Sequence, residues 1–306
     1  MLDAETNPDP RSIGPCVLSI HAHPDDEASK GASTMARYRT QGVRTVLITC
    51  TGGEAGEILN PAADSPEARA DLGKVRMAEL DEAVRIIGYD ALYLLGYRDS
   101  GMPDTEWNAD PRNFANADLD EAVGRIVRVL RAERPQVVVT YDNDSRGYSH
   151  PDHLRVHETS VLAFDRAGDP DWYPDAGDPW QPLKLYYSSG FSRRRIRTMH
   201  EWLIDHGEES PFHAWIDRMA QDGDDEDATT TRIDVSDFLE IGRAALLAHR
   251  TQVAPDSIFF SMPLDVARDL HPWDEYVLAR SLVETGQVDD EFETDLFAGI
   301  PVHTGS

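Results

Sequence analysis

The first half of the chain repeats one pattern, in which a short apolar run is followed by a turn and then by an amphipathic stretch. Nearly continuous apolar runs that alternate with amphipathic helices are typical of a parallel sheet with helices on both faces. The pattern therefore predicts an α/β fold built on a Rossmann-like, mostly parallel sheet. The predicted strands are 16–21, 43–50, 91–95 and 136–141, and the predicted helices are 30–41, 65–87, 119–132 and 153–164.

The pattern changes from Gly168 onward. Residues 168–182 are rich in Gly, Pro and Asp, which is typical of a long loop. We expect residues 1–167 to form the Rossmann-like core, and residues 168–306 to form a smaller α+β region that packs over the rim of the core. The elements predicted in this second part are a strand at 184–189 and helices near 194–206, 211–220 and 237–249.

Composition narrows the functional classes. The chain of 306 residues carries 29 Lys plus Arg against 56 Asp plus Glu, and the net charge of −27 opposes binding to nucleic acid or to an anionic membrane. No apolar run reaches the roughly 20 residues that a membrane span needs, and the first residues lack the pattern of a signal peptide. We therefore expect a cytoplasmic protein in which Cys16 and Cys50 are buried thiols and do not form a disulfide.

Histidines and acids gather at two places. The stretch "HAHPDDE" (21–27) follows the first predicted strand, and "YSHPDH" (148–153) follows the fourth. The carboxyl ends of parallel strands meet at one edge of a sheet, where ligands bind. We therefore expect the two clusters to converge although they are far apart in sequence. A lone surface histidine needs no functional explanation, but two converging His/Asp clusters predict a site.

Two imidazoles and one carboxylate from these clusters can hold a zinc ion at about 2 Å and leave one position open for water, as catalytic zinc sites do. Bound zinc lowers the pKa of that water to about 7 and polarises a carbonyl group, so hydrolysis of an amide or ester follows. Adjacent Asp25 and Asp26 can divide the work, one as a ligand and the other as a general base. Similarly, one of His150 and His153 can bind the metal while the other faces the substrate.

Two other interpretations use the same residues. His23, Asp25 and His153 also match the facial triad of non-haem Fe(II) enzymes, and two His with one carboxylate accept Fe²⁺ as well as Zn²⁺. The alternation of strands and helices favours the hydrolase, because those oxygenases resemble jelly rolls built from strands. A non-enzymatic metal-binding or carbohydrate-binding module would need no spare acid beside its ligands, and this chain has Asp25 beside Asp26.

More polar residues follow the second and third predicted strands. The stretch "TCTGGEAGE" (49–57) has the glycines of a phosphate loop but lacks its lysine, and Glu54 and Glu57 would repel phosphate. A neutral polyol or a cationic amine suits this loop better. Glu57, Arg76 and Asp99 are suited to paired hydrogen bonds with a sugar, but each is also explained as a surface charge.

These motifs together resemble those of a known family. The stretches "AHPDDE", "TCTGGEAGEILNP", "LGKVRMAEL", "LGYRDSGMP" and "HPDH" are similar to the motifs of the zinc-dependent, LmbE-like deacetylase family that includes the N-acetylglucosaminyl-phosphatidylinositol deacetylases. Within this family the chain looks most like the mycothiol enzymes of actinobacteria. One of these is an amidase of mycothiol S-conjugates, and another deacetylates N-acetylglucosaminyl-inositol. The stretches "SKGAS", "AHRTQ" and "PWDEYVLARS" look like those of the amidase.

The resemblance implies a reaction and a set of roles. The reaction would be cleavage of the glucosaminyl amide of a small-molecule thiol conjugate, a detoxification step that releases glucosaminyl-inositol and an N-acetylcysteine S-conjugate. The chain differs from its relatives between Tyr148 and His150, where they usually have Pro and it has Ser149. The implied roles are His23, Asp26 and His153 as Zn²⁺ ligands, Asp25 as general base, His150 as the residue that assists the leaving amine, Asp152 as its orienting partner, Tyr148 as a carbonyl-polarising group, and Lys30, Glu57, Arg76 and Asp99 as substrate contacts.

Overall fold

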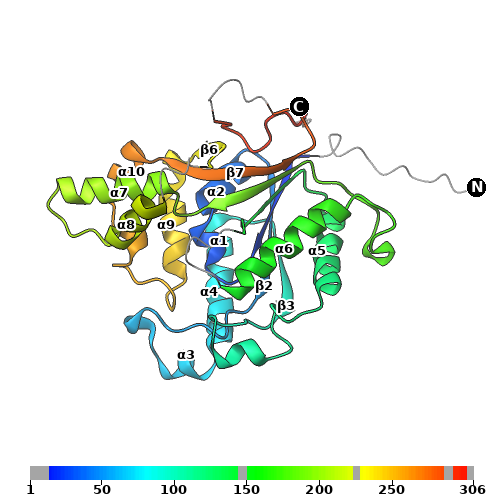
Figure 1. Cartoon of the computed structure of the whole chain (residues 1–306), viewed down its shortest axis with the longest axis horizontal. Coiled ribbons are helices and arrows are strands. Elements are labelled where there is room, and N and C mark those ends of the chain that lie inside the picture. Colours follow the sequence, from blue (N-terminus) through cyan, green and yellow to red (C-terminus); the bar gives the residue numbers. More distant parts are fainter. Residues whose placement is uncertain (1–13, 144–149, 223–227, 286–291, 302–306) are drawn as a thin grey trace, which may run out of the picture.

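The computed structural model describes residues 14–143, 150–222, 228–285 and 292–301 (Figure 1). These residues contain a seven-stranded sheet in the order β3-β2-β1-β4-β5-β7-β6. Strands β1 to β5 pair in parallel, and β7 lies antiparallel between β5 and β6. The predicted α/β fold with a mostly parallel sheet is confirmed. The strands are β1 (Cys16–His21), β2 (Arg44–Thr51), β3 (Ala91–Tyr97), β4 (Val137–Thr140), β5 (Lys184–Ser189), β6 (Thr231–Asp234) and β7 (Trp273–Ser281).

Helices cover both faces of this sheet. Leu18 of β1 packs with residues of α5 and α6, whereas the adjacent Val17 packs with residues of α2, α4 and α9. Successive side chains of a strand point to opposite faces, and helices cover both faces, so the central strands are nearly continuous apolar runs. The helices are α1 (Asp26–Ser29), α2 (Ala32–Thr40), α3 (Pro66–Ala70), α4 (Leu72–Ile87), α5 (Leu119–Glu133), α6 (Pro151–Arg166), α7 (Arg193–Asp205), α8 (His213–Asp222), α9 (Leu239–Ala248) and α10 (Leu264–Leu270).

A smaller apolar cluster lies among the later helices. Ile196, Met199 and Leu203 of α7 pack against Phe212 and Met262. In Figure 1, α7, α8 and α10 lie at one end of the molecule, on the far side from α5 and α6. Strands β5, β6 and β7 nevertheless belong to the same sheet as β1 to β4. The division of the chain at residue 167 stays a prediction.

Two features of the prediction need correction. The helix predicted at 65–87 is two helices, because the Asp71 side chain accepts a hydrogen bond from the Lys74 backbone N–H and so begins α4 as an N-cap. Strand β7 was not predicted, because its polar Asp274, Glu275 and Arg280 hide the period of a strand. The strand at 184–189 is confirmed with its bounds.

The structure can be compared with two expectations drawn from composition, which concern the cysteines and membrane-spanning helices. Cys16 and Cys50 are both buried free thiols, as predicted. Within the described ranges, no helix has the length and apolar character needed to cross a membrane.

The order of the strands sets the position of the site. From β1 the sheet is extended on one side by β2 and β3, and on the other by β4 and β5. The connections therefore leave β1 and β4 toward opposite sides, which opens a crevice beyond their carboxyl ends. The segment after β1 and the start of α6 after β4 are the two segments that carry the histidine clusters.

Candidate metal centre and active site

The structure brings together the three predicted metal ligands. Nitrogen and oxygen atoms of His23, Asp26 and His153 all lie within 4.8 Å of one another. Asp26 Oδ2 is 3.5 Å from His23 Nδ1 and 3.4 Å from His153 Nε2. In a tetrahedral site with bonds of about 2 Å, two ligand atoms lie about 3.3 Å apart. The donor set and its spacing therefore fit one metal ion.

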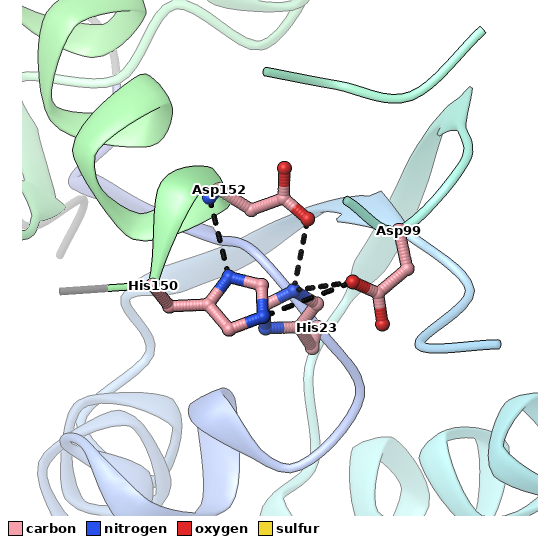
Figure 2. Close-up of side chains that lie close together, drawn as sticks. All are labelled: His23, Asp99, His150 and Asp152. Atoms are coloured by element: carbon pink, nitrogen blue, oxygen red, sulfur yellow. Dashed lines mark hydrogen bonds and ion pairs between the residues drawn. The ribbon is translucent and has the colours of Figure 1, made fainter. Parts of the chain in front are cut away.

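A carboxylate behind His23 orients this ligand. Asp152 Oδ2 lies 3.1 Å from His23 Nε2, on the opposite side of the ring from Nδ1 (Figure 2). Asp152 is fully buried and also accepts hydrogen bonds from the backbone N–H of Ser100, at 2.9 Å, and from the Ser100 hydroxyl. Metal-binding histidines commonly donate their second N–H to a carboxylate in this way. Nδ1 of His23 is thus the nitrogen available to a metal.

A second group of potential ligands shares His23. Asp99 Oδ1 lies 3.5 Å from His23 Nε2 and 3.8 Å from His150 Nε2, and these residues form a cluster with Asp152 (Figure 2). The carboxylate of Asp152 is already engaged by Ser100 and His23. We therefore favour the first group, His23, Asp26 and His153, as the metal centre.

Asp26 is held as a charged carboxylate. Its Oδ1 accepts a hydrogen bond from Lys30 Nζ at 2.6 Å, and its Oδ2 accepts one from the His23 backbone N–H at 3.0 Å. Burial by itself would raise the pKa of Asp26, but Lys30 and His153 outweigh burial and hold this pKa well below its usual range. A carboxylate that stays ionised is the form that binds a metal.

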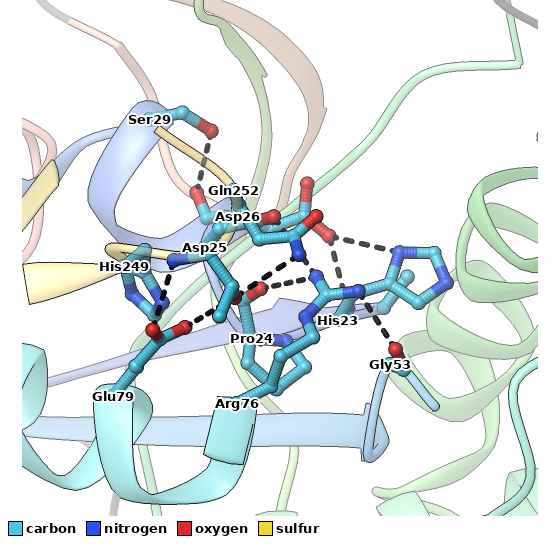
Figure 3. Close-up of polar contacts among 12 residues, drawn as sticks. His23, Pro24, Asp25, Asp26, Ser29, Gly53, Arg76, Glu79, His249 and Gln252 are labelled. Carbon is cyan, nitrogen blue, oxygen red and sulfur yellow. Dashed lines mark hydrogen bonds and ion pairs between the residues drawn. The ribbon is translucent and has the colours of Figure 1, made fainter. Parts of the chain in front are cut away.

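Asp25 has a different environment from that of its neighbour. Arg76 Nη2 donates to Asp25 Oδ2 at 2.9 Å and to the Pro24 carbonyl at 2.6 Å, and Arg76 Nη1 donates to the Gly53 carbonyl at 2.9 Å (Figure 3). Burial raises the pKa of the Asp25 carboxyl although Arg76 opposes this shift. A raised carboxyl pKa moves an acid toward the range in which a general base works.

Asp25 also has an unusual backbone. Its φ is 116°, in a region that residues other than glycine rarely adopt. Conformations of this kind persist where surrounding contacts enforce them, and they concentrate at functional sites.

His150 begins α6 beside the metal centre. Its ring centroid is 4.5 Å from that of His23, and its Nδ1 accepts a hydrogen bond from the Asp152 backbone N–H at 3.2 Å. A neutral ring that accepts at Nδ1 carries its proton on Nε2. Burial lowers the pKa of His150 to about 4, and His23 adds to this effect. The hydrogen bond that Asp152 donates to His150 comes from its backbone N–H, and the orienting role of its side chain stays a prediction.

The predicted substrate residues are distributed unevenly. Asp99 is 2% exposed and lies against the histidines, whereas Arg76 is 4% exposed and bonds to Asp25 and to backbone carbonyls. Lys30 is half-buried beside Asp26. Glu57 is exposed, and its carbonyl accepts a hydrogen bond from Gln252 at 3.0 Å. Tyr148 and Ser149 lie outside the described residues.

Several residues of the site were not predicted. Tyr141 stacks on His153 with ring centroids 4.6 Å apart, and its hydroxyl accepts a hydrogen bond from the Ala22 N–H at 3.0 Å. Ser100 bonds to Asp152, and His249 bonds to Glu27 at 2.5 Å. The positions of Tyr141 and Ser100, just beyond the ends of β4 and β3, were a usable signal, because side chains at strand carboxyl ends face the crevice.

The fold and the site together define a class of metal-dependent hydrolases. Residues 18–164 match the family described as PIG-L: GlcNAc-PI de-N-acetylase. The chain belongs to this family, and it is accordingly a hydrolase that acts on carbon–nitrogen amide bonds.

Individual relatives extend the likeness to nearly the whole chain. The chain is 43% identical over 293 residues to a mycothiol S-conjugate amidase of Streptomyces coelicolor, covering 93% of this chain and 97% of the relative. It is 41% identical over 293 residues to a 1D-myo-inositol 2-acetamido-2-deoxy-alpha-D-glucopyranoside deacetylase of Geodermatophilus obscurus, covering 93% and 98%.

A solved structure supports the fold. The N,N'-diacetylchitobiose deacetylase from Pyrococcus horikoshii superposes with a TM-score of 0.60 at 19% identity, covering 87% of this chain and 84% of that chain.

Proposed function

We propose that this protein is a zinc-dependent amidase that cleaves the glucosaminyl amide of mycothiol S-conjugates. The products are glucosaminyl-inositol and an N-acetylcysteine S-conjugate, so the reaction serves detoxification. The observation that carries the proposal is the convergence of His23, Asp26 and His153 beside Asp25, in a chain that is 43% identical to an enzyme of that name over 93% of its length.

The donor set supports zinc. Two imidazole nitrogens and one carboxylate oxygen, with a carboxylate behind one imidazole, suit Zn²⁺ and also accept Fe²⁺. A metal ion bound there supplies a Lewis acid for the amide carbonyl and lowers the pKa of a bound water. We propose Zn²⁺ as the resident ion and Fe²⁺ as the alternative.

The protein residues move the protons. Asp25 takes a proton from the attacking water, and the contact with Arg76 keeps its carboxylate in place. The water oxygen adds to the amide carbonyl, and the carbon–nitrogen bond then breaks. The proton that Asp25 has taken passes to the leaving nitrogen, so the amine departs neutral and the Asp25 carboxylate is restored. His150 keeps its proton on Nε2 and assists this step by donating a hydrogen bond to the reacting group. Tyr148 is proposed to donate a hydrogen bond to the carbonyl oxygen.

The substrate is proposed to lie with its amino sugar toward the loops after β2 and β3. Asp99 and Glu57 follow these strands, and carboxylates there suit paired hydrogen bonds with hydroxyl groups. Lys30 is proposed to contact the thiol-conjugate side. The substrate contact expected of Arg76 stays a prediction; because its described hydrogen bonds go to Asp25 and two carbonyls, we propose that Arg76 holds Asp25 in place. We place the enzyme in the cytoplasm, which is consistent with its two free thiols.

One alternative function has specific support. The relative from Geodermatophilus obscurus, at 41% identity, is a deacetylase of the acetylated amino-sugar inositol. Both reactions hydrolyse an amide on the same amino sugar, and they differ in the acyl group that is removed from its nitrogen.

A competition assay tests the proposal. Zinc-loaded protein would receive a mycothiol S-conjugate and N-acetylglucosaminyl-inositol together, with the acyl products quantified by mass spectrometry, with and without a chelator. Predominant, chelator-sensitive release of the N-acetylcysteine S-conjugate supports the amidase. Preferential release of acetate would assign the protein to the deacetylase reaction, and cleavage of neither substrate would refute both.

A further inference from the structure

The segment His249–Gln252, which follows α9, contacts the active site from a distant part of the sequence. It belongs to the "AHRTQ" stretch, to which the proposed reaction assigns no role. The Thr251 N–H and hydroxyl donate to the two oxygens of Glu79, at 2.9 and 2.7 Å. Gln252 Nε2 donates to the Glu57 carbonyl at 3.0 Å. The segment is therefore attached both to α4 and to the loop after β2.

His249 makes the contact that reaches deepest. Its Nε2 donates to Glu27 Oε1 at 2.5 Å, and the side chains of both residues are fully buried. The second oxygen of Glu27 accepts a hydrogen bond from the Asp25 backbone N–H at 3.0 Å. Each oxygen of this carboxylate thus meets an N–H donor, one from the C-terminal part of the chain and one from the proposed general base.

This arrangement explains how Asp25 keeps its rare backbone conformation. A residue other than glycine with φ near 116° must be held by its surroundings. The Arg76 guanidinium holds the carboxylate end of Asp25 (Figure 3). Glu27 holds the backbone end of Asp25. His249 in turn holds Glu27. A glutamate side chain has several rotamers, and this second hydrogen bond restricts it to one of them.

We propose that His249 is a positioning residue for Asp25: through Glu27 it fixes the backbone that aims the Asp25 carboxylate at the attacking water. This inference rests on the proposed role of Asp25 as general base. A displacement of about 1 Å at a reacting group can cost 10²-fold in rate. The predicted consequence of losing His249 is therefore a loss of turnover without loss of metal or substrate binding.

The variants follow from the geometry. His249→Leu removes the donor to Glu27 and keeps an apolar volume in the buried site. His249→Gln restores an N–H close to the position of Nε2. Arg250→Ala is the matched control, because this neighbouring side chain is exposed and pairs with Glu82 at the surface. If His249→Leu does not fold, His249→Asn replaces it, because the asparagine amide is too short to reach Glu27.

The expected result is a fall in kcat of about 10- to 100-fold in His249→Leu, with KM within about twofold and the metal content unchanged. His249→Gln should recover most of the loss, and Arg250→Ala should match the wild type. In an Asp25→Asn background, His249→Leu should have almost no further effect, because the group that it positions is already gone.

Each other outcome overturns the inference. An unchanged kcat in His249→Leu would show that Glu27 does not need His249. An equal loss in the Asp25→Asn background, or a loss that follows metal content, would show a structural role. Failure of the proposed function is recognised separately, since the wild type would then cleave neither substrate or Asp25→Asn would stay fully active.

Discussion

Replacing Arg76 by methionine distinguishes two roles for one side chain. As a substrate contact, Arg76 would bind the sugar or inositol. In the structure its guanidinium donates to Asp25 Oδ2 at 2.9 Å and to the carbonyls of Pro24 and Gly53 at 2.6 and 2.9 Å. Arg76→Met keeps much of the side-chain volume and removes all three hydrogen bonds.

The structure sets the size of the effect on stability. Removing one partner of a buried ion pair costs about 3 to 5 kcal/mol. The Asp25 side chain is 26% exposed, so water can partly replace the guanidinium, and we expect about 3 kcal/mol, the low end of that range. A domain stabilised by about 5 to 15 kcal/mol would remain folded. Turnover should fall about 10- to 100-fold, because Asp25 is no longer held in place.

Three measurements on the same variant test this reasoning. Urea titration of the zinc-loaded protein gives the change in unfolding free energy, elemental analysis gives the metal content, and steady-state kinetics separates kcat from KM. We expect a lower kcat with KM little changed. Arg76→Lys should restore only part of the loss, because one ammonium group cannot reproduce the planar guanidinium. A raised KM with unchanged kcat and stability would refute the reasoning and identify Arg76 as a substrate contact.

Three further predictions concern the metal and the buried groups. Chelation should abolish amide cleavage and one equivalent of Zn²⁺ should restore it, whereas activity in protein shown to be metal-free would contradict the metal centre. Lys184→Met should lower the unfolding free energy by about 3 kcal/mol in denaturant titrations, because it leaves the buried Glu293 carboxylate without the ammonium group now 2.8 Å away; an unchanged midpoint would count against this pair. Burial raises the pKa of Cys16 from 9.0 to about 12 and that of Cys50 well above its usual value. Above about pH 9 the thiols therefore ionise in the unfolded chain but not in the folded one. The free energy of unfolding should accordingly fall as the pH rises through that range. At pH 8, a thiol reagent should therefore label almost none of the two cysteines in the folded protein, and it should label both after unfolding. Rapid labelling of the native protein would disprove their burial.

The five parallel strands and the convergence of the histidines were predictable because they depend on local pattern, whereas the antiparallel strand β7 was not. β1 and β5 were predicted with the bounds that they have. β1 is a short, mostly apolar run, and β5 follows the Gly- and Pro-rich loop at 168–182. Parallel strands share one carboxyl edge, so His23 and His153 had to approach each other once the sheet was predicted.

The partners of each polar group were not predictable in this way. Asp152 bonds to His23 across 129 residues of sequence, and His249 bonds to Glu27 across 222. Such contacts depend on how helices and loops pack on the finished sheet, and the spacing of residues along the chain carries no record of that packing. Arg76 shows the same limit, because a helix position alone does not say whether its guanidinium meets solvent, a substrate or a carboxylate.

The sequence by itself therefore determined the parallel part of the sheet, the edge at which the candidate site lies and the residue types gathered there, because hydrophobic periodicity and strand direction are local properties. Only the tertiary structure decided which nitrogen of His23 faces Asp26 and which faces Asp152, and which carboxylate is kept charged. It also brought His249, from the C-terminal part of the chain, into contact with Glu27, which accepts a hydrogen bond from Asp25. Those properties depend on distances of a few ångströms between segments that meet only when the chain has folded.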